Sequence, residues 1–435
     1  MASNLRVDQI LPSTSTNVAI GTATGTVTLA GTTSGTFSGN LTGSVNSSGV
    51  TTVTTLRATS IVGVTTAGIS TVYVTSINEG QLQGYRNMLY NGAMVVNQRG
   101  FTSAASTSTG YSVDRWMWSP SNDSVVAVGQ STSAAAQPTG QGFTNSLHVR
   151  VTTADSSLSA AQYAVIEQKL EGYDLQRIKK GSANAEPVTL SFWVRSSKIG
   201  TYIAELIDND NTRQVSKSYS IDSANTWEKK IITFPADTIG AFDNDNNGSM
   251  QVIWWLAAGS NYTSGTLNTS WATSTNTNRA IGQVNFLDTA GAQFNLTGCQ
   301  LEVGPNATDF EFRSYGDELR MCQRYYYKDT YTVSASSQHM FFAGYMFGTT
   351  QLEGVYFFPV EMRTAPTLGT SALSTFRLRN GGETPTFIGI FGANTRSGLV
   401  YTTNSVTGTQ KDGNSLESNS TNGTVTYLDF SAELL

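Results

Sequence analysis

The sequence has few of the residues on which many protein functions depend. Its 435 residues include 2 histidines, 2 cysteines and 9 prolines, and only 13% of them are charged. Two cysteines, Cys299 and Cys322, are too few for a disulfide framework. Helical surfaces normally carry many charged side chains, so this shortage argues against a helical protein. With 41 glycines and abundant Thr, Ser and Asn, the composition predicts an all-β fold.

Other absences exclude classes of partner. The net charge is −5 and no basic patch is visible, so we expect no nucleic-acid partner. No apolar run approaches the ~20 residues that cross a bilayer, so we expect no membrane insertion. The N-terminal sequence MASNLRVDQILPS lacks the apolar region of a signal peptide. We therefore expect a protein made in a cytoplasm and not exported by the secretory route.

Motifs of catalysis are also missing. A nucleophilic serine needs a base, usually histidine, and His148 and His339 are far apart and isolated. The sequence contains no G-x-S-x-G, H-E-x-x-H or C-x-x-C motif. A glycosidase needs only two carboxylates about 5 to 9.5 Å apart, and the acidic residues do not exclude such a pair. We expect no enzyme, with a glycan depolymerase as the alternative.

The first part of the chain is rich in Ser, Thr and Gly, yet it carries a pattern of short strands. Apolar residues such as Val27 and Leu29 alternate at the strand period of two, with turn formers between the pairs. Each strand is too short to bury its apolar side alone, so burial has to come from other copies. We predict an attachment segment in residues 1–20 and a thin, intertwined, three-stranded shaft over 21–84. The alternative is a disordered Ser/Thr linker.

From Tyr85 onward the pattern changes to regular strands separated by turn-rich loops. It predicts a jelly-roll β-sandwich over 85–313, a connecting helix over 314–328 and a distal β-rich domain over 329–435. Ser314 is the expected N-cap of the helix. We place four tryptophans in the core: Trp116, Trp193, Trp254 and Trp255. The expected strands are 146–151, 188–196, 201–208, 227–235, 250–259, 294–304, 339–347 and 353–362.

Several motifs resemble segments of bacteriophage tail fibre proteins of the cyanophage type. They are RNMLYNGAMVVNQRG (86–100), YSVDRWMW (111–118), VIEQKLEG (165–172) and CQLEVGPNATDFEFRSYGDELRMCQRYYYK (299–328). In those proteins the first and last of these open and close a jelly roll that is similar to carbohydrate-binding modules. The N-terminal NLRVDQILPSTS also resembles the start of such fibres. The resemblance implies a homotrimer, held to the phage tail, baseplate or an adaptor protein through its N-terminus.

The function that the resemblance implies is attachment of a virion to its host. We expect a tail fibre, or tail-tip adhesin, that is assembled in the host cytoplasm and binds a host surface polysaccharide such as lipopolysaccharide or O-antigen. The distal domain is the expected receptor-binding tip. Two alternatives stay open: a glycan depolymerase tailspike, and a purely structural tail connector.

One loop has a composition suited to glycan binding. Residues 260–279 place Tyr262, Trp271 and Arg279 among Asn, Ser and Thr. Aromatic rings can stack on sugar rings while polar side chains bind the hydroxyl groups. We therefore predict these three residues as glycan-binding; the alternative for Trp271 is a place on a strand, packed in the sandwich.

A second loop contains acidic residues at alternating positions. Asp243, Asp245 and Asn247 precede Gly248, as at the start of an EF-hand loop. The Glu expected at the twelfth position is replaced by Trp254, so we reject an EF-hand. Two interpretations remain, a structural calcium site and an Asx-rich surface turn.

Overall fold

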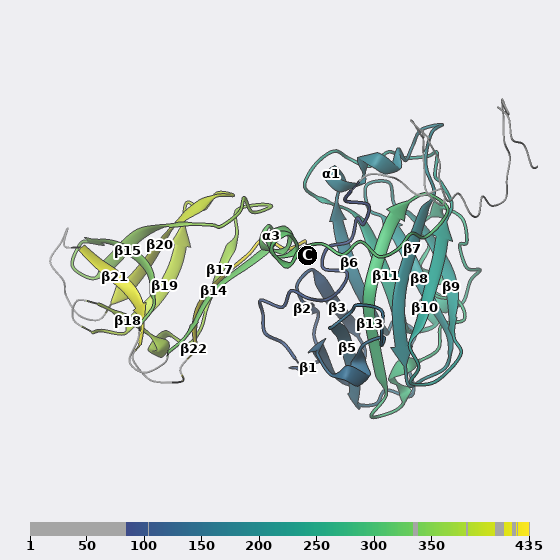
Figure 1. Cartoon of the computed structure of the whole chain (residues 1–435), viewed down its shortest axis with the longest axis horizontal. Coiled ribbons are helices and arrows are strands. Elements are labelled where there is room, and N and C mark those ends of the chain that lie inside the picture. Colours follow the sequence, from purple (N-terminus) through teal and green to yellow (C-terminus); the bar gives the residue numbers. More distant parts are fainter. Residues whose placement is uncertain are drawn as a thin grey trace, which may run out of the picture. The chain divides into compact units, whose positions relative to one another are not determined.

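The computed structural model describes residues 84–102, 104–333, 338–379, 382–404, 413–419, 423 and 425–434. The predicted attachment segment (1–20) and shaft (21–84) lie outside the described residues, apart from Gly84. The described residues belong to one compact unit whose main elements are antiparallel strands (Figure 1). The prediction of an all-β fold is confirmed.

The first part of the described chain is a β-sandwich. One sheet has six strands, in the order β1 (Ala104–Ser106), β4 (Val125–Ser131), β5 (Ser146–Thr153), β13 (Gln293–Val303), β7 (Val188–Ser196) and β10 (Glu228–Phe234). The facing sheet has seven strands, in the order β12 (Ala272–Thr273), β9 (Arg213–Ile221), β8 (Gly200–Asp208), β11 (Gly248–Ala258), β6 (Tyr163–Glu171), β3 (Trp116–Ser121) and β2 (Gly110–Val113).

A single aromatic-rich core lies between these two sheets. Trp116 on β3 and Trp254 on β11 have ring centroids 5.4 Å apart, and Phe192 of the facing sheet lies 5.7 Å from Trp254. All three side chains are fully buried. Side chains alternate between the two faces along strand β7. Phe192 and Val194 point into this core, while Trp193 and Arg195 point outward. The prediction of a core position is thus wrong for Trp193, which is half-buried on the outer face.

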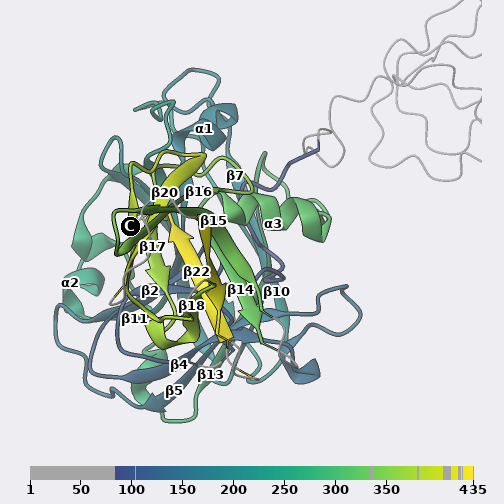
Figure 2. The same ribbon diagram turned by 90° about the vertical axis from the view of Figure 1, so that its left-hand side faces the viewer.

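Two further sheets follow in the chain. A three-stranded sheet has the order β14 (Tyr326–Thr332), β22 (Val425–Ser431) and β17 (Thr367–Thr370), and β14 and β22 lie side by side (Figure 2). A six-stranded sheet has the order β18 (Phe376–Leu378), β21 (Gly413–Ser418), β15 (Met340–Phe347), β16 (Gln351–Phe357), β20 (Ser397–Asn404) and β19 (Pro385–Phe391). These strands share a second core, separate from that of the sandwich.

The described α-helices are short: α1 (Gly172–Leu175), α2 (Ser260–Thr263) and α3 (Tyr315–Gln323). Ser314 caps α3 as predicted, since its side chain accepts a hydrogen bond from the backbone N–H of Asp317 at 3.2 Å. The helix predicted over 314–328 is too long, because Tyr326 already begins β14. Of the helices in the described part of the chain, none has the length and apolar character to span a membrane.

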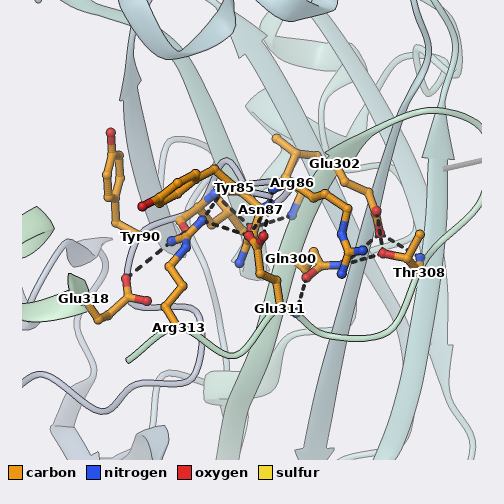
Figure 3. Close-up of polar contacts among 12 residues, drawn as sticks. Tyr85, Arg86, Asn87, Tyr90, Gln300, Glu302, Thr308, Glu311, Arg313 and Glu318 are labelled. Atoms are coloured by element: carbon orange, nitrogen blue, oxygen red, sulfur yellow. Dashed lines mark hydrogen bonds and ion pairs between the residues drawn. The ribbon is translucent and has the colours of Figure 1, made fainter. Parts of the chain in front are cut away.

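The motifs that open and close the sandwich bind one another (Figure 3). The carboxylate of Glu311 accepts hydrogen bonds from the backbone N–H groups of Arg86 and Asn87, at 3.1 and 3.0 Å. The guanidinium of Arg313 donates to the backbone carbonyls of Asn87 and Leu89. These contacts join residues more than 200 positions apart in the sequence. The charged side chains of the closing motif therefore hold the backbone of the opening motif in place.

Candidate functional site

The outer face of the seven-stranded sheet, turned away from the main core, carries a small apolar cluster of its own. Side chains alternate along a strand, so Trp254 points into the main core and Trp255 points to the outer face. The cluster consists of Val165, Ile203, Ile253, Trp255 and Ala280. Trp255 is buried, as predicted, but it is buried beneath this outer face and not between the sheets.

Three aromatic rings form a wall on this face. Tyr163 at the start of β6 and Tyr262 on α2 pack edge-on against each other, with centroids 5.4 Å apart. Trp255 lies 5.3 Å from Tyr262 and 6.2 Å from Tyr163. Both tyrosines are half-buried. The wall therefore combines a fixed tryptophan with two rings that offer part of their surface to a ligand.

An ion pair holds the wall in place. Glu205 on β8 is fully buried and accepts hydrogen bonds from the Trp255 indole N–H at 2.9 Å and from the Arg279 guanidinium at 3.0 Å. Arg279 also lies over the rings of Trp255 and Tyr262, at 5.0 and 5.9 Å. Burial raises the pKa of Glu205, and the positive charge of Arg279 opposes that shift. Arg279 therefore pairs with a buried carboxylate and contacts both rings, and these interactions fix the position of the rings.

The loop that carries Tyr262 and Arg279 is fixed by its backbone. The N–H of Gly265 donates to the carbonyl of Thr277 at 2.9 Å, and the N–H of Ala280 donates to the carbonyl of Tyr262 at 2.9 Å. A side chain at Gly259, just before α2, would collide with the Ser159 carbonyl at 2.2 Å. Since the loop is folded back on itself, Tyr262 and Arg279 reach the same site although they are 17 positions apart in the sequence.

Between these rings and the neighbouring strands lies a hollow of about 170 Å³, which we call the β6–β11 groove. Its most unusual residue is Glu167 on β6, only 6% exposed. Among the described residues, no donor forms a hydrogen bond or ion pair with its carboxylate. Burial raises the pKa of Glu167. The groove is lined by Ser119, Tyr163, Val165, Glu167, Gln251, Ile253, Trp255, Tyr262 and Arg279.

The structure thus brings together two of the three residues predicted to bind glycan. Tyr262 and Arg279 line the groove, whereas Trp271 packs against the main core. The indole N–H of Trp271 donates to the carbonyl of Pro235 at 2.9 Å, and the Lys180 ammonium lies 5.1 Å from its ring centroid. This position beside β12 agrees with the alternative interpretation of Trp271 as a packed residue.

The acidic loop forms a turn closed by its own side chains. The Asp245 carboxylate accepts hydrogen bonds from the backbone N–H of Asn247 at 2.9 Å and from its side-chain amide at 2.5 Å. The backbone carbonyls of Asp243, Asp245 and Asn247 bind Gln176, Tyr173 and Gly172 respectively. In the described part of the chain, no group of three or more His, Cys, Asp or Glu side chains is placed to hold a metal ion. Hydrogen bonds between the Asp245 side chain and Asn247 are typical of an Asx-rich surface turn, one of the two interpretations of this loop.

Comparisons with known proteins gave the following findings. No protein-family model matches the chain, and no curated protein sequence matches it. Among solved structures, the enzymatically active domain of tailspike protein 4 from bacteriophage CBA120 has a TM-score of 0.29 and 14% identity over 51% of this chain. The match spans 22% of that tailspike chain.

Two carbohydrate-binding modules are also similar over half of the chain or slightly less. The module TmCBM61, in complex with β-1,4-galactotriose, has a TM-score of 0.26 and 13% identity, covering 50% of this chain and 99% of its own. A family 11 module from Clostridium thermocellum, in complex with a β-1,3-1,4-mixed-linked tetrasaccharide, has a TM-score of 0.24 and 12% identity, covering 46% and 96%. Identities this low do not make the chain a member of either group.

Proposed function

We propose that this protein binds a glycan in the β6–β11 groove. The observation that carries the proposal is Glu167, a carboxylate that is 6% exposed, lines the groove and has no protein donor among the described residues. Since Glu167 lines the groove and no protein donor among the described residues satisfies its carboxylate, the hydroxyl groups of a sugar can donate hydrogen bonds to both of its oxygens. The rings of Tyr163 and Tyr262 beside it offer apolar faces to the same sugar.

We further propose that glycan binding serves the attachment of a phage to its host cell. The support is the resemblance of the opening and closing motifs to tail fibre proteins, together with the network that they form in the structure (Figure 3). Binding without cleavage fits this role, since Glu302 and Glu311 in the closing motif both accept hydrogen bonds from protein groups. The protein would act in the virion, after assembly in the host cytoplasm.

Replacing Tyr262 by alanine tests the groove directly. An aromatic contact at the centre of a binding site contributes about 2 kcal/mol or more, so we expect affinity for host surface polysaccharide to fall about 30-fold. The matched control is Tyr315→Ala, an exposed tyrosine at the start of α3. Isothermal titration of both full-length variants measures the effect. If Tyr262→Ala bound as tightly as the control, the sugar would lie elsewhere.

A homotrimer is the third part of the proposal. Apolar side chains share one face of the sheet that contains β16, β19 and β20: the exposed Phe391 stands opposite the half-buried Leu399, which stands opposite the exposed Val355. Phe391 is 70% exposed and Phe357 is 75% exposed in the single chain. Further copies of the chain would cover such a face. Three linked groove sites would also raise avidity by ~10²–10⁴ over a single site.

We expect sedimentation equilibrium to give a mass of three times the 46.5 kDa of one chain. We expect Phe391→Asp to weaken the assembly, because it places a charge on the face to be covered. The exposed control Tyr315→Asp should leave the mass unchanged. A wild-type protein that sediments as a monomer at micromolar concentration would contradict the trimer.

A further inference from the structure

The β6–β11 groove continues into a second hollow along the same strands. Gln251 on β11 lines the groove and also a polar hollow of about 440 Å³ next to it. We call this second hollow the cationic end of the groove. Its other lining residues are Lys169, Asn209, Asn247, Gly248, Arg363 and Leu434.

The two hollows follow one another along β6. Tyr163, Glu167 and Lys169 are separated by even numbers of residues, so their side chains share the outer face of the sheet. Lys169 stands opposite Gln251 in the register of β6 and β11. The six steps along the strand from Tyr163 to Lys169 correspond to about 20 Å at ~3.3 Å per residue. A linear ligand can therefore contact the aromatic wall with one part and the cationic end with another.

Two positive charges at the cationic end have no acidic partner in contact. Arg363 donates to the backbone carbonyls of Ala432, Asn246 and Glu433, at 2.7, 3.1 and 2.9 Å. Backbone carbonyls orient a guanidinium but do not neutralise its charge. Lys169 forms neither an ion pair nor a hydrogen bond through its ammonium group within the described residues.

The acidic groups nearby do not cancel these charges. Glu167 acts on Lys169 through space, without an ion-pair contact. Glu171, the acid that acts most strongly on Arg363, is held by Arg324 in a two-point ion pair at 2.8 and 2.7 Å. The cationic end is thus an open polar space with uncompensated positive charge.

We propose that the cationic end binds an anionic substituent, so that the ligand of the groove is an acidic oligosaccharide. This inference rests on the proposed glycan-binding function. A neutral part of the ligand contacts Tyr262 and the carboxylate of Glu167, and a carboxylate or phosphate group of a second sugar contacts Lys169 and Arg363. Charge-assisted hydrogen bonds of this kind are stronger than neutral ones, so the charged group contributes both affinity and selectivity.

The test compares acidic oligosaccharides with their neutral counterparts. The probes are a uronic-acid oligosaccharide and its carboxyl-reduced form, and a phosphorylated oligosaccharide and its dephosphorylated form. We expect the full-length protein to bind at least one acidic probe about 10-fold more tightly than its neutral form, because hydrogen bonds between charged groups are stronger than neutral ones. The acidic probe that shows this preference identifies whether the anion is a carboxylate or a phosphate.

Lys169→Gln is expected to remove most of this preference while leaving affinity for the neutral probe within about 2-fold. Lys229→Gln, an exposed lysine on β10 of the other sheet, is the matched control and should keep the preference. Equal binding of acidic and neutral probes, still sensitive to Tyr262→Ala, would overturn the anionic ligand and leave the proposed function intact. A wild-type protein that bound none of the probes would count against both proposals.

Discussion

Replacing Glu167 by alanine is expected to reduce affinity for the glycan about 10- to 100-fold, because hydrogen bonds to a charged group contribute about 1.5 to 3 kcal/mol and each 1.4 kcal/mol is a factor of ten. The same change should leave the free energy of unfolding close to that of the wild type. Among the described residues no protein group donates to this carboxylate, so removing it breaks no hydrogen bond or ion pair within the protein. If Glu167 had a structural role instead, the substitution would lower the free energy of unfolding as well as the affinity.

Binding should also depend on pH. Burial raises the pKa of Glu167, while the charges of Lys169 and Arg279 oppose the shift and that of Glu205 adds to it. Only the ionised carboxylate offers both oxygens as acceptors. Affinity is therefore expected to fall as the pH drops through the raised pKa, above the range where an ordinary Glu titrates. Glu167→Gln should bind weakly with little pH dependence, and titrations over a pH series measure both.

Replacing Arg115 by alanine is expected to lower the free energy of unfolding by about 3 to 5 kcal/mol, the usual cost of removing one partner from a buried ion pair. Its guanidinium is fully buried, lies 2.6 Å from Glu433 and donates to the Lys169 carbonyl at 2.5 Å. It also stacks 3.5 Å from the centroid of Tyr325. The change therefore leaves the buried Glu433 carboxylate with Arg99, 3.0 Å away, as its remaining ion-pair partner.

The control for Arg115→Ala is Arg396→Ala. Arg396 is 76% exposed and pairs with the exposed Glu361, so its loss is expected to cost about 1 kcal/mol or less. Urea denaturation of both variants gives the comparison. An Arg115→Ala protein as stable as Arg396→Ala would show that the C-terminal residues are not held by this pair.

Much of the architecture could be predicted from the sequence, because it depends on local patterns. The strand predicted over 188–196 agrees with β7, and the strand predicted over 250–259 overlaps β11 closely. Alternation predicts which side chains share a face, but it does not show which face is covered. Trp193 and Trp255 illustrate this limit: both lie on an outer face, and only Trp255 is covered by a loop.

The site was harder to predict because it depends on contacts that are distant in the sequence. Tyr262 and Arg279 could be found from loop composition, since aromatic and polar residues occur together there. Glu167 could not, because its importance comes from what surrounds it: a covered sheet face and no donor in contact. The one available signal was its position on a strand with Tyr163 and Val165, where alternation gives all three the same face.

The most direct test of the central claim is binding of the full-length protein to candidate host cells, with and without periodate oxidation of their surface glycans. The wild type is expected to bind untreated cells and to lose that binding after oxidation. Tyr262→Ala is expected to bind untreated cells weakly, and Tyr315→Ala to bind them normally. Wild-type binding that survives oxidation, or Tyr262→Ala binding as strong as the control, would contradict a glycan receptor in the β6–β11 groove.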